Sequence, residues 1–171
     1  MVFPMSHTEP LRVLFLCTHN SARSILAEAL LNHLGAGRFQ AFSAGSSPRA
    51  HQQPNPLALR VLESAGIATT RLRSKSWDEF AGPGAPAVDL VITVCDNAAG
   101  EQCPFWPGAP ATAHWSYSDP SEVQGSEEEK LAAFRRTMHA IRTRVQLLLA
   151  VPPERLARES LQQEARALAR Y

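Results

Sequence analysis

The chain has 171 residues, of which 44% are hydrophobic and 19% are charged, and its formal net charge is +1. This length is enough for one domain with a buried core. The balanced charge argues against nucleic acid or an anionic membrane as a partner, because either would favour a clear basic excess. Residues 1–10 lack the basic and apolar regions of a signal peptide, and no apolar run is long enough to span a membrane, so we expect a cytoplasmic protein.

Strand patterns and helix patterns alternate along the chain. Apolar runs predict strands at residues 12–16, 39–44, 89–94 and 111–115. The spacing of leucines predicts a helix over residues 24–34 that stops at Gly35, and Asn55-Pro56 opens a second helix over residues 57–65. This alternation is typical of an α/β doubly wound fold with a four-stranded parallel sheet flanked by helices.

A long helix in the last third of the chain is the clearest element. Ser126 and Glu129 form a capping box at its start, apolar residues then recur at steps of three and four, and Pro152-Pro153 ends it. The residues that follow predict an extra C-terminal helix, which packs either on the core or on a second copy of the chain. We therefore divide the chain into a flexible N-terminus (1–10), one domain (11–151) and a C-terminal helical extension (152–171).

Three cysteines, Cys17, Cys95 and Cys103, are candidates for catalysis. Structural disulfides are rare in a reducing compartment, and a zinc site needs closely spaced ligand pairs that this sequence does not offer. Cys17 and Cys95 each end a predicted strand, and Asp119 follows another. Because ligands bind at the carboxyl ends of parallel strands, we expect these side chains to meet at one edge of the sheet.

The segment from Cys17 to Ser24 connects the first strand to the first helix. It has the pattern C-x5-R-S, in which a short loop can point its backbone N–H groups inward and Arg23 can bond two oxygens of an anion. Asn20 tolerates the left-handed backbone that such a loop needs. The predicted oxyanion-binding residues are Thr18, His19, Asn20, Ser21, Ala22, Arg23 and Ser24.

The same loop predicts an activated thiol at Cys17. Positive charge and a helix N-terminus lower the pKa of a cysteine thiol to about 3.5–7.5, from about 8.5 for a free thiol. Ser24 can donate a hydrogen bond to the resulting thiolate. The alternative is a buried cysteine at the end of a strand, followed by an ordinary helix cap.

The loop and Asp119-Pro120 together resemble the low-molecular-weight tyrosine phosphatase family, and most of all its arsenate reductase branch. The resemblance extends over about residues 11–150. It implies that Cys17 is the nucleophile and that Asp119 is the general acid that protonates the leaving oxygen. From its residue type alone, Asp119 could equally be a turn residue, because Asp-Pro is a common turn pair.

Cys95 and Cys103 carry the resemblance to the reductases, since the phosphatases usually lack cysteines here. The resemblance implies a thiol relay: Cys17 attacks arsenic(V), a second thiol attacks the Cys17 sulfur, and arsenite leaves. If Cys95 is that thiol, Cys103 can then attack Cys95 and return Cys17 as a thiol. Which of the two attacks first stays open, and Cys95 could also be a small hydrophobe at a buried strand end.

Two departures from the reductase pattern leave the electron donor open. His19 stands where thioredoxin-coupled reductases often have Gly, and Ala22 where they often have Cys. The donor is therefore either thioredoxin or glutathione with glutaredoxin, and no tightly bound cofactor is expected. Some relatives bind a potassium ion beside the loop, and the residues that match its ligands are Asn20, Glu28, Ser43 and Asp78.

Two other functions compete with arsenate reduction. One is a phosphotyrosine phosphatase with inert or protective extra cysteines. No aromatic wall for its substrate is obvious in the sequence, although Trp106 and Trp115 could help to form one. The other is a non-enzymatic module that holds phosphate or arsenate in the loop. A pure binding module has no need of an activated thiol, and for that reason we rank it last.

Overall fold

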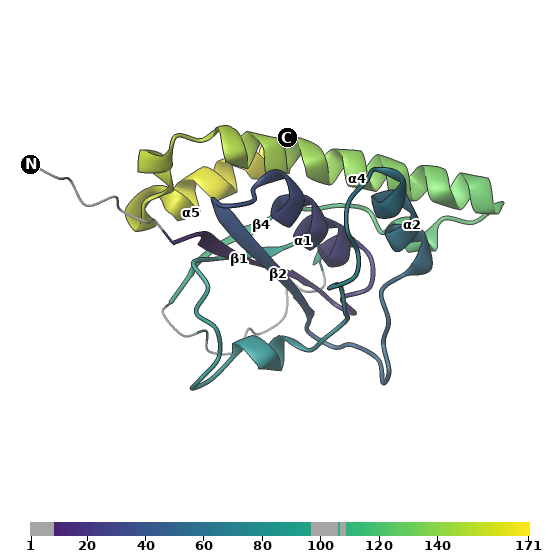
Figure 1. Ribbon diagram of the computed structural model, residues 1–171, viewed down its shortest axis with the longest axis horizontal. Coiled ribbons are helices and arrows are strands. Elements are labelled where there is room, and N and C mark those ends of the chain that lie inside the picture. The colour runs from purple at the N-terminus through teal and green to yellow at the C-terminus, as the bar shows by residue number, and fades with distance from the viewer. Residues whose placement is uncertain (1–8, 97–105, 107–108) are drawn as a thin grey trace, which may run out of the picture.

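The computed structural model describes residues 9–96, 106 and 109–171. Four parallel strands form one sheet in the order β2-β1-β3-β4 (Figure 1). The strands are β1 (Leu11–Cys17), β2 (Phe39–Gly45), β3 (Leu90–Thr93) and β4 (Ala111–His114). The four-stranded parallel sheet and the α/β doubly wound fold predicted from the sequence are confirmed.

Helices follow the strands as the capping residues predicted. The α-helices are α1 (Arg23–Leu34), α2 (Pro56–Ser64), α4 (Glu127–Ala150) and α5 (Arg158–Ala167), and the short 3-10 helices are η1 (Trp77–Phe80), η2 (Pro120–Glu122), η3 (Pro153–Leu156) and η4 (Leu168–Arg170). Asn55 accepts a hydrogen bond from Leu57 N at the start of α2. Ser126 accepts one from Glu129 N at the start of α4, so both predicted caps are present.

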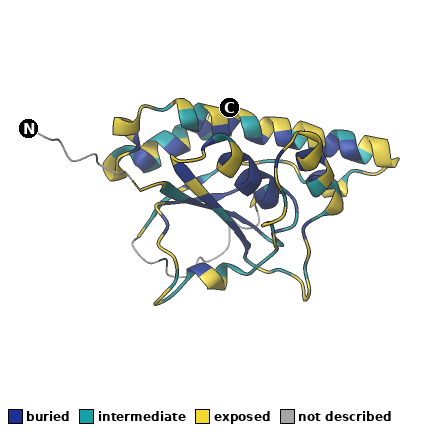
Figure 2. Cartoon of the chain, viewed as in Figure 1, coloured by how far each residue is buried: buried dark blue, intermediate teal, exposed yellow. Residues whose placement is uncertain are grey.

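The sheet separates two apolar clusters. Its strands are largely buried (Figure 2). Alternate β1 residues point to opposite faces: Phe15 packs in the larger cluster beside Trp115, and Leu16 lies in the smaller one. Helices α1, α2, α4 and α5 gather on one side of the sheet, and η1 lies on the other (Figure 1). Packing on both faces of the sheet thus fixes the positions of the strand ends.

The C-terminal helix α5 packs against the edge strand β4. Thr112 of that strand donates its N–H to Gln162 Oε1 (3.1 Å), and its carbonyl oxygen accepts from Arg166 Nε (2.9 Å). Trp115 Nε1 donates to the carbonyl oxygen of Ala165 (2.9 Å). The extra helix therefore covers an edge whose backbone groups would otherwise be open to another strand. Among the described residues, no helix is long and apolar enough to cross a membrane.

The strand order places a switch point between β1 and β3. From β1, the chain continues to β2 on one side and later returns to β3 on the other. In open parallel sheets, the crevice at such a switch point is where ligands bind. Cys17 ends β1, and Cys95 lies just beyond the end of β3, so both candidate cysteines stand at this crevice.

Candidate active site

The loop that begins at Cys17 is fastened to the end of β2. Cys17 pairs with Gly45 in the sheet register, and the carbonyl oxygen of Cys17 accepts from Ser46 N (3.0 Å). Ser47 N donates to the carbonyl oxygen of Thr18 (2.8 Å). A Cβ atom on Gly45 would lie 2.7 Å from that same Thr18 oxygen, so any other residue would collide with the loop. Gly45 is not among the site residues predicted from the sequence.

Asn20 holds the turn of the loop from inside. It is fully buried and has a left-handed backbone with φ of 57°, as its residue type predicted. Its Nδ2 donates to Ser24 Oγ (2.8 Å) and to Ser43 Oγ (2.9 Å), and its Oδ1 accepts from Lys75 N (3.0 Å). Its carbonyl oxygen accepts from Ser74 Oγ (2.6 Å). The loop shape is therefore set by buried hydrogen bonds to three other segments.

Arg23, the first residue of α1, joins the loop to the segment that carries Asp119. Its Nη1 donates to the carbonyl oxygen of Tyr117 (2.9 Å), and its Nη2 lies 3.5 Å from Asp119 Oδ2. Its Nε is buried and has no hydrogen-bond partner within the described part of the chain. A buried guanidinium donor without a partner at a helix N-terminus fits an anion-binding site.

Asp119 reaches the site from the loop after β4. Its side chain is 25% exposed, and its Oδ1 accepts hydrogen bonds from Ser121 N (2.9 Å) and Ser121 Oγ (2.7 Å) at the start of η2. One carboxylate oxygen thus caps the turn, and the other faces Arg23. The two interpretations of Asp119, turn residue and candidate acid, are therefore compatible in one conformation.

Cys95 lies beside Cys17 at the mouth of the crevice. Both side chains are buried, Cys95 is the group that most affects the pKa of Cys17, and Thr18 Oγ1 lies 3.5 Å from Cys95 Sγ. The hydrogen bond with Cys95 and burial raise the pKa of the Cys17 thiol, whereas Arg23 and the Thr18 N–H lower it. This corrects the lowered pKa predicted from the loop alone. Two neighbouring thiolates would repel each other, so the pair of cysteines retains a proton.

Asp96, the residue after Cys95, is tied to the neighbouring strand. Its Oδ1 accepts from His114 Nε2 (2.8 Å) and from Ser116 Oγ (3.1 Å). The other ring nitrogen of His114 lies 2.8 Å from Thr93 Oγ1. His114 is not among the site residues predicted from the sequence, whereas here it fixes the position of the residue next to Cys95.

The remaining predicted residues take different places. The carbonyl oxygen of Ser21 accepts from Asn55 N (2.8 Å), Ala22 precedes α1, and His19 is half-buried in the loop. Ser24 is fully buried with its Oγ accepting from Asn20, so its expected hydrogen bond to the Cys17 thiolate stays a prediction. Cys103 lies outside the described residues.

The tryptophans proposed for a substrate wall are core residues. Trp115 is fully buried against Phe15, and Trp106 is buried in the smaller apolar cluster with its ring 6.0 Å from that of Trp77. Neither indole faces an open site. The burial of both indoles contradicts the suggestion that Trp106 and Trp115 help to form a wall for an aryl substrate.

Three of the four residues predicted to hold potassium meet beneath the loop. Ser43 Oγ accepts from Asn20 Nδ2 and donates to Glu28 Oε1 (2.7 Å). Asp78 does not join them: it is exposed in η1 and, within the described residues, forms no hydrogen bond or ion pair with the other three. The ammonium group of Lys75 lies there instead, 3.8 Å from Glu28 Oε1. The predicted potassium site is thus corrected, because a side-chain cation already lies against its carboxylate.

The sequence profile of one protein family, low molecular weight phosphotyrosine protein phosphatase, matches residues 12–166. The chain belongs to this family. An arsenate reductase of Bacillus licheniformis is 39% identical over 134 residues, which cover 78% of this chain and 91% of the relative. With such relatives, the chain falls in the arsenate reductase branch of the phosphatase family, as its sequence pattern predicted.

Two solved structures extend this relationship. The arsenate reductase of Archaeoglobus fulgidus has a TM-score of 0.61 and 29% sequence identity, over 80% of this chain and 98% of its own. The thioredoxin-dependent arsenate reductase of Corynebacterium glutamicum has a TM-score of 0.54 and 26% identity, over 82% of this chain and 65% of its own. The phosphatase-family fold described above is therefore the fold of known arsenate reductases.

Proposed function

We propose that this protein is an arsenate reductase that works through a thiol relay. The observation that carries the proposal is the pair of buried sulfurs: Cys95 lies next to Cys17 at the end of an anion-binding loop and has the largest influence on the pKa of Cys17. A phosphatase of this fold needs only the loop thiol. A second thiol beside the first is what a reaction ending in a disulfide requires.

The first step uses Cys17, Arg23 and Asp119. Cys17 gives its thiol proton to the arsenate dianion and attacks the arsenic atom as a thiolate. A sulfur–arsenic bond forms and one arsenic–oxygen bond breaks. Asp119 gives its proton to the departing oxygen, which leaves as water. Arg23 and the backbone N–H groups at the start of α1 hold the remaining oxygens as charge builds up on them.

The second step moves two electrons onto arsenic. The Cys95 thiolate attacks the Cys17 sulfur, a disulfide forms, and the electron pair of the breaking sulfur–arsenic bond stays on arsenic. Arsenic passes from the +5 to the +3 state and leaves as arsenite. The proton of the Cys95 thiol has already gone to solvent before this attack. Thr18, whose hydroxyl lies 3.5 Å from Cys95 Sγ, is placed to stabilise the attacking thiolate.

An external thiol must then reduce the disulfide. We infer that thioredoxin is this donor, with Cys103 moving the disulfide from Cys17 to a Cys95–Cys103 pair that thioredoxin can reach. The likeness to the thioredoxin-dependent reductase of Corynebacterium glutamicum supports this choice over glutathione with glutaredoxin. Such a cycle requires a reducing compartment, so we place the protein in the cytoplasm.

Residual phosphatase activity is the second function we propose, because Arg23 and Asp119 stand together beside Cys17. Phosphate and arsenate have the same tetrahedral shape, and the first step applies equally to a phosphoryl group. Phosphorus is not reduced by thiols, so the Cys17 adduct with phosphate goes on to hydrolysis. This activity should need Cys17 and Asp119 but not Cys95.

A single-turnover experiment on the fully reduced protein tests the proposal. Arsenate is added without any external reductant, and arsenite and free thiols are counted. We expect one arsenite per chain and a fall from three thiols to one, since each disulfide consumes two of the three cysteines. Peptide mapping then identifies the disulfide as Cys17–Cys95 or Cys95–Cys103.

Two variants separate the alternatives. Cys95→Ser should stop arsenite release and keep hydrolysis of 4-nitrophenyl phosphate, whereas Cys17→Ser should stop both. Full arsenate turnover in Cys95→Ser would exclude the relay through Cys95. Arsenite that appears only after glutathione is added would point to glutathione and glutaredoxin. A wild-type protein that binds phosphate with neither activity would be a binding module.

A further inference from the structure

The network beneath the loop contains both the oxygen ligands of a cation site and the cation, and both are side-chain or backbone groups of this chain. Asn20, Ser43 and Glu28 form one hydrogen-bonded series, from Asn20 Nδ2 to Ser43 Oγ (2.9 Å) and from Ser43 Oγ to Glu28 Oε1 (2.7 Å). Ser43 and Asn20 are fully buried, and Glu28 is 8% exposed. A buried carboxylate needs a positive charge beside it.

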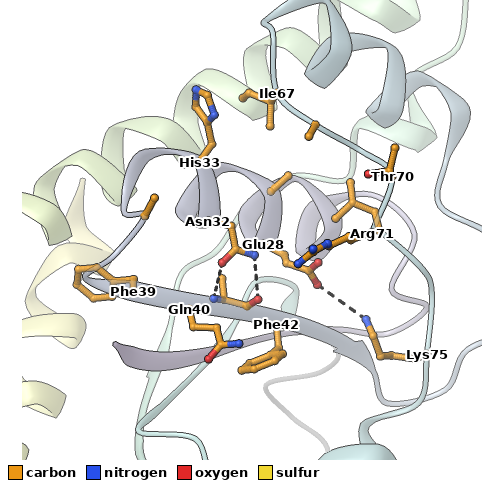
Figure 3. Close-up of a pocket in the computed structure, with 15 residues that line it drawn as sticks. Glu28, Asn32, His33, Phe39, Gln40, Phe42, Ile67, Thr70, Arg71 and Lys75 are labelled. Atoms are coloured by element: carbon orange, nitrogen blue, oxygen red, sulfur yellow. Dashed lines mark hydrogen bonds and ion pairs between the residues drawn. The ribbon is translucent and has the colours of Figure 1, made fainter. Parts of the chain in front are cut away.

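Lys75 supplies that charge. Its Nζ donates to the carbonyl oxygens of Ser43 (2.7 Å) and Arg73 (2.9 Å) and lies 3.8 Å from Glu28 Oε1. Its side chain is 9% exposed, and Figure 3 shows it pointing towards Glu28 across the space between β2 and α1. The ammonium group is thus surrounded by two carbonyl oxygens and a carboxylate, which are the oxygen ligands that hard metal cations use.

Lys75 also forms a direct hydrogen bond to the loop. Its backbone N–H donates to Asn20 Oδ1 (3.0 Å), and the preceding residue, Ser74, donates its hydroxyl to the carbonyl oxygen of Asn20 (2.6 Å). Asn20 holds an unfavourable left-handed conformation that its surroundings must maintain. One residue therefore both fixes the turn of the anion loop and neutralises the carboxylate behind it.

We infer that the Lys75 ammonium is a built-in replacement for a monovalent metal ion, and that it makes the anion loop independent of potassium. A metal ion cannot share this space, because it would lie against an ammonium group with only one carboxylate to offset two charges. Lys75 is a positioning residue: it acts on the anion through Asn20. The inference deepens the proposed function, but it rests on the loop and not on arsenate reduction.

The choice of lysine is specific to this position. The chain has only two lysines, Lys75 and Lys130, among its 17 basic residues. An ammonium group is a compact charge with three donors in a tetrahedral arrangement, whereas a guanidinium is a flat fork. A cluster of three oxygens around one point suits the ammonium, so Lys75→Arg should not preserve the network.

A cavity lies beside Lys75. Glu28 and Lys75 line a cavity of about 650 Å³ between α1, β2 and the segment before η1 (Figure 3). His33, Thr70 and Arg71 also line it. A small cation from solution can therefore reach Glu28 once the ammonium group is removed.

The test compares Lys75→Met with a matched control, Lys130→Met, which removes the other lysine. Phosphate affinity, 4-nitrophenyl phosphate hydrolysis and the thermal unfolding midpoint are measured in potassium, sodium and tetramethylammonium chloride at equal ionic strength. We expect wild type and Lys130→Met to behave alike in all three salts. In tetramethylammonium chloride, Lys75→Met should bind phosphate about tenfold more weakly and unfold at a lower temperature. Potassium should restore both properties.

A double variant locates the rescuing ion. In Lys75→Met/Glu28→Gln the carboxylate is gone, so potassium should no longer raise phosphate affinity or the midpoint. If Lys75→Met does not fold in any salt, the Glu28→Gln variant is measured in its place. We expect its unfolding midpoint to be lower than that of wild type and not to be raised by potassium.

Four results would overturn the inference. Two are a wild-type protein whose phosphate affinity or unfolding midpoint is higher in potassium than in sodium, and a Lys75→Met protein whose phosphate affinity is unchanged. The other two are a loss of phosphate affinity in Lys75→Met that no cation restores, and a restoration by potassium that persists without Glu28. None of these measurements involves arsenate or Cys95, so they can be interpreted even if the thiol relay is wrong.

Discussion

Arg23 and Asp119 face each other across the mouth of the anion loop, with Nη2 and Oδ2 3.5 Å apart. The loop after β4 brings the carboxylate to a guanidinium that starts the first helix. The ion pair leaves part of each group free, because Arg23 Nε lacks a partner among the described residues and Asp119 is one-quarter exposed. This arrangement allows Arg23 to bind an anion while Asp119 stays beside the oxygen that leaves that anion.

Replacing Asp119 with Asn should therefore slow catalysis without abolishing anion binding. The variant keeps an oxygen that can cap η2 through Ser121 but loses the transferable proton. We expect 4-nitrophenyl phosphate hydrolysis and arsenite release to fall about 10²–10⁴-fold, with phosphate affinity unchanged or higher. Steady-state kinetics and phosphate titration measure the two effects separately.

The matched control for Asp119→Asn is Glu122→Gln, which changes an exposed carboxylate in the same 3-10 helix. It should leave the rate unchanged. If Asp119→Asn also kept its full rate, Asp119 would be a turn residue and not the acid.

The pairing of Cys17 with Cys95 predicts a shift in thiol reactivity. Their hydrogen bond and the repulsion between two thiolates raise the pKa of Cys17, whereas Arg23 lowers it. In Cys95→Ala the raising contributions from the second sulfur disappear, so Cys17 should be alkylated by iodoacetamide at lower pH than in wild type. Mass spectrometry of the Cys17 peptide across a pH series gives the comparison.

The sign of this effect distinguishes a coupled pair from two independent cysteines. A raised pKa favours the neutral thiol in the folded protein, so the stability that it contributes is lost as pH rises above the ordinary thiol value of about 9. Wild type should therefore lose stability at alkaline pH more steeply than Cys95→Ala. Identical alkylation profiles in the two proteins would mean that Cys95 does not influence Cys17.

Much of the fold was predictable because local signals and tertiary packing agree here. The Asn55 and Ser126 caps, the apolar run that became β1 and the left-handed Asn20 all follow from residue type and position. The meeting of Cys17, Cys95 and Asp119 followed from one rule about strand ends in parallel sheets.

What the sequence could not predict depends on contacts between distant segments. Lys75 carries no local signal for a buried cation, because its partners come from β2 and α1. The pKa of Cys17 was predicted from the loop alone and went the wrong way, since the neighbouring sulfur of Cys95 could not be placed. Trp115 was misjudged for the same reason: an aromatic residue after a strand can face either the core or a site.

Gly45 should be required for anion binding although it touches no anion. Its absent side chain makes room for the carbonyl oxygen of Thr18, which would lie 2.7 Å from an added Cβ. Because that oxygen belongs to the loop backbone, Gly45→Ala should displace the loop, destabilise the protein by about 1–3 kcal/mol and weaken phosphate binding. Thermal unfolding and phosphate titration measure these effects.

Gly66→Ala provides the comparison for Gly45→Ala. Gly66 has φ of 76° and open space where a Cβ would stand, so its replacement strains the backbone away from the loop. It should lower stability with no change in phosphate affinity. Equal phosphate affinity in the two variants would show that the loop tolerates a side chain at position 45.

The contact between His114 and Asp96 should control how fast Cys95 attacks. Asp96 follows Cys95 directly and accepts hydrogen bonds from His114 Nε2 and Ser116 Oγ, which hold its pKa below the ordinary range. His114→Ala removes the stronger restraint, so the Cys17–Cys95 disulfide should form about tenfold more slowly after arsenate is added. Hydrolysis of 4-nitrophenyl phosphate, which does not use Cys95, should be unchanged.

The pH dependence provides a second and independent measurement of this contact. A carboxylate with a lowered pKa stabilises the fold above its unfolded pKa of about 4, and that contribution is lost as pH falls through the lower, folded value. The difference in unfolding midpoint between wild type and His114→Ala should therefore be present at neutral pH and shrink in acid. Carboxyl NMR should show the pKa of Asp96 rising in the variant. A disulfide that forms at the wild-type rate despite that rise would mean that Asp96 does not position Cys95.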